Sequence, residues 1–178
     1  PFLEKKIKAK EQIFWVCPLI EDSKKLDFSS TTKMFQLVNK KFPKKVGFIH
    51  GSLEQEDKEK VLKKFLDNEI SILVSTTVIE VGIDFPNATV IIIENSNKFG
   101  LAQLHQLRGR IGRGNKSGTC ILLFKNQLSQ NAKKRIQILK SSDDGFYIAE
   151  EDMKLRGYGD IVGYKQSGMK LFKIADPV

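Results

Sequence analysis

Cysteine and long apolar runs are scarce in this sequence, and both scarcities narrow the class of protein. The 178 residues include two cysteines, Cys17 and Cys120, which lie in apolar surroundings without metal-ligand spacing. We expect both as buried thiols in a reducing compartment. No stretch approaches the roughly 18 apolar residues that cross a bilayer. These features predict a cytoplasmic protein with no metal site and no membrane partner.

A signal peptide and an acidic excess are also missing. The chain begins at Pro1, so we expect it to be cut or processed from a longer one. Its 30 Lys and Arg against 21 Asp and Glu give a net charge of +9. This balance favours polyanionic partners, nucleic acid first, although a solvated basic surface has the same composition.

Short apolar runs alternate with segments of helical periodicity through the first two thirds of the chain. The runs that predict strands are 13–19, 46–49, 70–74, 89–93 and 119–124. Because they are apolar throughout, they are typical of parallel strands that are buried on both faces. The alternation predicts an α/β fold, a parallel sheet with helices on both faces. We assign this domain to residues 1–126.

Residues 127–178 predict a different unit. Helical segments are expected near 129–140 and 146–155, with Ile148, Met153 and Leu155 partly buried in the second. A glycine-rich loop follows over 156–168. Such a loop can bring its backbone close to a ligand, but a floppy surface loop near a terminus is an equally good explanation.

Three polar stretches follow strands of the predicted sheet. His50–Gly51 follows the second strand, 75–84 follows the third and 99–114 follows the fourth. Ligands of parallel α/β sheets bind beyond the carboxyl ends of the strands. We therefore expect all three stretches to meet at one functional edge.

The stretch 99–114, FGLAQLHQLRGRIGRG, has an unusual arrangement of charge. Arg108, Arg110 and Arg113 alternate with glycines at the end of a predicted helix. Guanidinium groups match phosphate oxygens, and glycine lets the backbone approach a ligand. The stretch predicts a phosphate clamp. The alternative is a solvated basic helix terminus, which the helix dipole favours.

The run QLRGRIGR resembles the sixth motif, QxxGRxGR, of superfamily 2 helicases. The longer stretch resembles the RecG branch-migrating DNA helicases, and bacterial transcription-repair coupling factors are similar. The resemblance implies the second, RecA-like motor domain of such an enzyme. It implies that Arg110 and Arg113 are catalytic arginine fingers on the γ-phosphate of ATP, with Gln106 beside the nucleotide.

Two more segments match motifs of the same superfamily. The segment HGSLEQ resembles HGxxxQ, which implies that His50 and Gly51 approach a nucleic-acid phosphate. The segment STTVIEVGID looks like motif V, in which Thr76 and Thr77 contact the DNA backbone, although both also suit a helix cap.

Motif V also carries a glycine and a carboxylate for the nucleotide. By this match, Gly82 and Asp84 line the nucleotide edge, and Asp84 reaches the ribose. The run IAEEDMKLRGYGDIVGYKQSG resembles the segment that couples ATP turnover to DNA translocation, which forms a helical hairpin and a loop. There we assign coupling roles to Arg156 and Gln166.

A phosphate loop, GxxxxGK[ST], and an acidic DExH-like motif are both missing. The chain by itself should therefore be inactive, with ATP and Mg²⁺ held mainly by an absent first motor domain. The resemblance implies a monomeric ATP-dependent helicase whose partners are branched DNA (forks, Holliday junctions) and the N-terminal motor and wedge domains of the same protein. Its expected roles are fork reversal, branch migration, DNA repair and recombination. A coupling factor and a non-catalytic nucleic-acid-binding RecA-like module are the alternatives.

Overall fold

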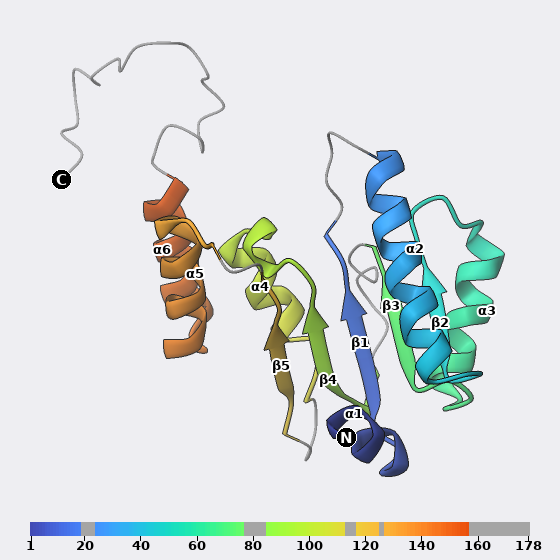
Figure 1. Cartoon of the computed structure of the whole chain (residues 1–178). Helices are drawn as coiled ribbons and strands as arrows, with labels where there is room; N and C mark the ends of the chain where they lie inside the picture. Colours follow the sequence, from blue (N-terminus) through green and yellow to red (C-terminus); the bar gives the residue numbers. More distant parts are fainter. Residues whose placement is uncertain (19–23, 77–84, 113–116, 125–126, 157–178) are drawn as a thin grey trace, which may run out of the picture.

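A single parallel sheet of five strands organises the molecule (Figure 1). The computed structural model describes residues 1–18, 24–76, 85–112, 117–124 and 127–156. The strands are β1 (Gln12–Val16), β2 (Val46–Ile49), β3 (Ile72–Ser75), β4 (Ala88–Ile93) and β5 (Thr119–Leu122). Their order across the sheet is β2-β3-β1-β4-β5, and every neighbouring pair is parallel. The predicted α/β fold is confirmed.

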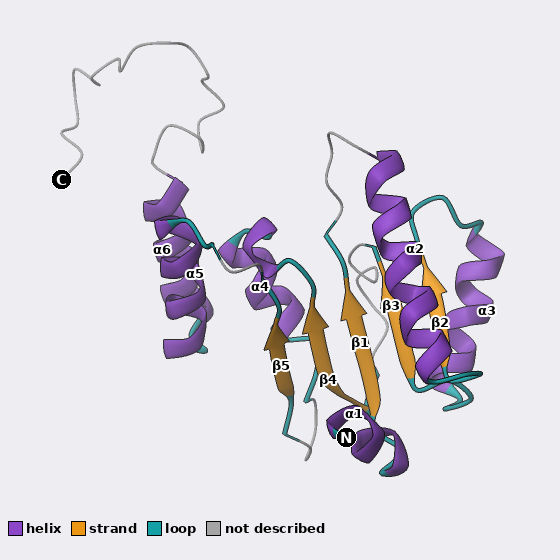
Figure 2. Cartoon of the chain, in the orientation of Figure 1, coloured by secondary structure: helices purple, strands orange, loops and turns teal. Residues whose placement is uncertain are grey.

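Helices cover both faces of this sheet (Figure 2). They are α1 (Phe2–Lys8), α2 (Lys24–Lys41), α3 (Gln55–Leu66), the short 3₁₀ helix η2 (Ser96–Lys98), α4 (Leu101–Arg108), α5 (Gln130–Ser141) and α6 (Gly145–Arg156). Helices α1 and α2 pack on one face, and α3 and α4 pack on the other. Helices α5 and α6 pack against α4 and against each other. No helix of the described part has the length and apolar character to cross a membrane.

Alternate strand residues build two separate cores, because successive side chains of a strand point to opposite faces. Ile13 belongs to the core under α1 and α2, and Phe14 belongs to the core under α3 and α4. In the second core the Phe14 ring lies 5.2 Å from the rings of both Phe65 and Phe85, centroid to centroid.

The direction of α4 contradicts the expectation of one functional edge. The helix begins beyond the carboxyl end of β4, but the Gly112 amide, four residues after the helix, donates to the Ala88 carbonyl at 3.1 Å. Ala88 is the first residue of β4. A crossover between parallel strands has to return to the amino end of the sheet. The end of the arginine stretch therefore lies at the amino edge, opposite His50.

The three apolar side chains of α6 that were expected to be partly buried differ widely in exposure. Ile148 is 1% exposed and Leu155 is half-buried, but Met153 is 43% exposed. Residues 148, 152 and 155 share one helix face at spacings of four and three. Met153 stands only one residue beyond Asp152, which turns it by about 100° away from that face.

Replacing Phe65 tests the aromatic core. Phe65→Ala removes a fully buried ring that touches two others, so it should lower the free energy of unfolding by about 3–5 kcal/mol. Leu66→Ala on the neighbouring, 42% exposed residue should cost less than about 1 kcal/mol. Denaturant titrations of both variants measure these values, and equal losses would contradict the described packing.

Candidate nucleotide and nucleic-acid edges

An aromatic row fixes His50 at the carboxyl end of β2. The Phe48 ring stacks on Phe35 of α2 at 5.0 Å and 14°, and the His50 ring lies 5.0 Å from Phe48. The next residue, Gly51, is exposed, and a Cβ added there would meet nothing within 4 Å. The packing around Gly51 therefore does not require a glycine. The open space leaves room for a ligand to approach the backbone closely, which glycine favours.

Thr76 lies beside this turn, at the end of β3. Its amide donates to the Ile49 carbonyl at 3.2 Å, and the residue is 3% exposed. Its hydroxyl has no hydrogen-bond partner among the described residues. A buried hydroxyl left unpaired costs about 1–3 kcal/mol. Thr76 therefore suits a contact that a bound phosphate would complete, and Thr77 lies outside the described residues.

The amino edge carries the other part of the predicted site. Helix α4 buries its three leucines at positions 101, 104 and 107, so Gln106 is turned to solvent. Arg110 is half-buried, and its guanidinium has no ion pair or hydrogen bond with a described residue. Gly112 adopts a φ of 69°, which favours glycine, and its amide anchors the segment to β4. Gly82, Asp84 and Arg113 lie outside the described residues.

Arg108 is not available to a phosphate, although the sequence groups it with the clamp. Its guanidinium donates to the Leu139 carbonyl at the end of α5 and to the Ser142 carbonyl at 2.9 Å. It also lies 3.0 Å from the Asp143 carboxylate, which is 95% exposed and so adds little. Of the three arginines, Arg108 joins α4 to the turn between α5 and α6.

His105 takes part in the same contact between α4 and the turn between α5 and α6, which we call the Arg108 joint. Its Nδ1 lies 3.0 Å from Arg108 Nη2, so Nδ1 accepts and the proton of the neutral ring is assigned to Nε2. A Cβ added to Gly145, the first residue of α6, would stand 3.3 Å from Nε2. The glycine therefore admits the imidazole ring to the start of α6.

Arg135 holds α5 at the opposite, carboxyl edge. Its guanidinium donates to the Phe99 carbonyl at 2.7 Å and to the Asn97 carbonyl at 3.3 Å. No local pattern marks Arg135 as important, since its partners lie 36 and 38 positions away in the chain. Helix α5 is thus held near its middle by Arg135 and at its end by the hydrogen bonds of Arg108.

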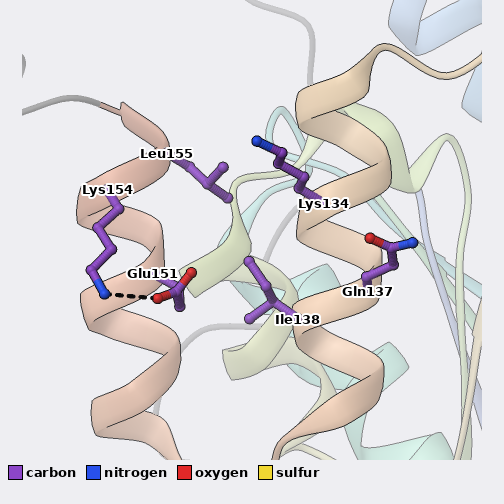
Figure 3. Close-up of a pocket in the computed structure, with 6 residues that line it drawn as sticks. All are labelled: Lys134, Gln137, Ile138, Glu151, Lys154 and Leu155. Carbon is purple, nitrogen blue, oxygen red and sulfur yellow. Dashed lines mark hydrogen bonds and ion pairs between the residues drawn. The ribbon is translucent and has the colours of Figure 1, made fainter.

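Helix α6 runs back along α5 toward the carboxyl edge (Figure 1). A groove of about 360 Å³ separates the two helices, with Lys134, Gln137, Ile138, Glu151, Lys154 and Leu155 around it (Figure 3). Lys154 pairs with Glu150 at 2.9 Å and with Glu151 at 3.0 Å, and these hydrogen bonds raise the pKa of the lysine. Arg156 ends α6, and Gln166 lies outside the described residues.

The two thiols differ from the site residues in chemistry, although Cys17 directly follows β1 and its amide donates to the Ser75 carbonyl at the carboxyl edge. Burial raises the pKa of Cys17 to about 12 and that of Cys120 to about 11. Thiols with such pKa values stay protonated and unreactive at neutral pH. The described residues contain no cluster of histidine, cysteine and carboxylate side chains that could hold a metal ion.

Comparisons with known proteins show the family to which this chain belongs. Residues 4–115 match the model of the helicase conserved C-terminal domain, and residues 142–177 match ATP-dependent DNA helicase RecG, domain 3, C-terminal. A RecG helicase of Bacillus subtilis is 46% identical over 99% of this chain and 26% of its own length. A RecG helicase of Thermotoga maritima is 47% identical over 98% of this chain and 23% of its own.

Solved structures give the same result. The structure of RecG bound to a three-way DNA junction aligns with a TM-score of 0.76 and 43% identity, over 97% of this chain and 22% of that one. The Sulfolobus solfataricus SWI2/SNF2 ATPase core aligns at 0.57 with 14% identity, over 91% of this chain and 31% of that one, which shows the shared fold alone.

The fold and the matched segments define a RecA-like helicase motor domain, and the chain belongs to the family of helicase conserved C-terminal domains. Within that family it is of the RecG type, because residues 142–177, which include α6, match the RecG model and the relatives are RecG helicases. The chain spans about a quarter of the length of these relatives.

The Arg108 joint can be tested by hydrogen exchange. Arg108→Lys keeps the charge but loses the planar fork, so α5 and α6 should open more readily than the sheet. We expect amides of α5 and α6 to exchange about 10-fold faster or more, since hydrogen bonds from a charged donor contribute about 1.5–3 kcal/mol. Lys133→Arg, on the exposed side of α5, is the control. Uniform exchange across hairpin and sheet would contradict the joint.

Proposed function

We propose that this chain is the C-terminal motor domain of an ATP-dependent helicase or translocase that acts on branched DNA. The observation that carries the proposal is the separation of two edges. Arg110 lies at the amino edge of the sheet, and His50 and Thr76 lie at the carboxyl edge. The α5–α6 hairpin is held to both. RecG of known structure was bound to a three-way DNA junction, which supports branched DNA as the substrate.

At the amino edge the ligand is ATP with Mg²⁺, bound mainly by the first motor domain of the full-length protein. Arg110 fits this role because its guanidinium has no carboxylate partner in the described part of the chain. Arg110 and Arg113 stabilise the charge that develops on the transferred phosphoryl group, an effect of about 10³–10⁵ in rate for arginine fingers. Gln106 and the segment with Gly82 and Asp84 line the same nucleotide.

At the carboxyl edge the ligand is the DNA backbone. The Gly51 turn offers room for a phosphate, and the Thr76 hydroxyl offers a buried donor that lacks a partner among the described residues. His50 and Thr77 complete the contact. Contacts of this kind position a protein on DNA without reading its sequence, as suits an enzyme that moves along DNA.

The hairpin couples the two edges. A change around the nucleotide reaches the turn between α5 and α6 through Arg108, because this side chain binds two carbonyls there. Most of α6 belongs to the coupling segment; the helix ends at Arg156, and Gln166 lies further along the same segment. Movement of that segment against the DNA is the proposed output.

The biological roles follow from this proposed activity. They are replication-fork reversal, Holliday-junction branch migration, DNA repair and recombination, by a monomeric cytoplasmic enzyme whose wedge and first motor domains lie in the rest of the protein. The relatives described above are RecG helicases, so we propose this type over a transcription-repair coupling factor.

Arginine replacement in the full-length protein tests the nucleotide edge. Arg113→Ala should raise the barrier to junction-stimulated ATP hydrolysis by about 3 kcal/mol or more, while junction binding is kept. Arg110→Ala should act in the same direction, and Lys133→Ala on the exposed side of α5 is the control. Unchanged turnover in both arginine variants would instead favour a nucleic-acid-binding module without catalysis.

A further inference from the structure

Helix α6 exposes an unusual amount of apolar surface. Phe146 is 91% exposed, Tyr147 is 41% exposed and Met153 is 43% exposed. Phe146 and Met153 stand seven positions apart, so they lie on the same side of the helix. Tyr147 lies about 100° further around the helix and borders this side, so three apolar side chains are exposed on a helix of 12 residues, where a single exposed one is common. We name Phe146, Tyr147 and Met153 the outer α6 patch.

The outer α6 patch begins where the hairpin meets the arginine stretch. Gly145, next to Phe146, lies against the His105 ring of α4. Asp143, three residues before Phe146, pairs with Arg108, and Arg108 stands two residues from Arg110. Phe146, the most exposed side chain of the patch, is therefore one residue from the contact between α6 and α4, the helix that leads to the proposed nucleotide edge.

We propose that the outer α6 patch is a docking surface for the nucleotide-bearing motor domain of the same full-length protein. The inference rests on the proposed function, because Arg110 reaches ATP only if that domain closes over the amino edge. The chain has no phosphate loop, and its relatives are about four times as long, so the domain lies outside this chain. Phe146 continues the surface that such closure covers.

This docking explains why α6 is apolar on two sides. Ile148 and Leu155 face α4 and α5, and the outer α6 patch faces the partner domain only in the closed, nucleotide-bound state. Closure thus presses on α6 directly, in addition to acting through Arg108. The α5–α6 hairpin therefore responds to the bound nucleotide in two ways: through contact of the closing domain with α6, and through Arg108, which joins the hairpin to α4.

Thiol labelling of the full-length protein measures this closure. Phe146→Cys should react with a maleimide at least 10-fold more slowly when a non-hydrolysable ATP analogue and a three-way DNA junction are both added. Leu37→Cys is the matched control, because Leu37 is 64% exposed on α2, which packs on the opposite face of the sheet. Its rate should not change. The unsubstituted protein gives the background, to which Cys17 and Cys120 contribute little while their pKa values stay high.

An unchanged rate at position 146 would overturn the docking surface. So would equal slowing at positions 146 and 37, or slowing that depends on protein concentration and not on nucleotide, which indicates a second copy as the occupant. Phe146→Ser gives an independent readout. It should lower kcat/KM for ATP at least fivefold with junction affinity kept, whereas Leu37→Ser should leave both unchanged.

Different results would contradict the docking surface and the proposed motor function. If hydrolysis depends on Arg113 but position 146 stays equally reactive, only the docking surface is removed. If hydrolysis does not depend on Arg113 or Arg110, the proposed function itself fails, whatever the labelling rate at position 146.

Discussion

The guanidinium of Arg108 is the contact on which the arrangement of the helical hairpin depends. It lies at the end of α4 and donates to the carbonyls of Leu139, in the last turn of α5, and Ser142, just after that helix. Its side chain is only 19% exposed, so these hydrogen bonds are largely shielded from water. Removing the group would leave two carbonyls and the His105 ring without their donor, and the turn that begins α6 would lose its place.

Topology explains why this contact is useful. Parallel strands require each crossover to return to the amino edge, so α4 carries the chain from the proposed DNA edge to the proposed nucleotide edge. Helix α5, which follows β5, is held near its middle by Arg135 and at its end by Arg108. A rigid pair of helices between two ligand edges is a means of passing a displacement from one to the other.

Local patterns predicted much of this molecule, and long-range contacts were the part that they missed. The apolar runs predicted all five strands, because strands buried on both faces must be apolar throughout. In the arginine stretch, the spacing of the leucines distinguished these buried residues from Arg110. It could not distinguish the role of Arg108 from that of Arg110, because the partners of Arg108 lie more than 30 residues away. Met153, which was expected to be partly buried like Ile148, is far more exposed than Ile148, because apolar character alone does not say which face of α6 has a partner.

The central claim is that the hairpin transmits the state of the nucleotide through Arg108. The most direct measurement is the number of ATP molecules hydrolysed per base pair unwound by full-length protein with Arg108→Gln, on a three-way junction. The account predicts that hydrolysis persists within about threefold of the unsubstituted protein while unwinding falls about 10-fold or more, so the ratio rises. An unchanged ratio, with hydrolysis and unwinding falling together, would contradict transmission through this contact.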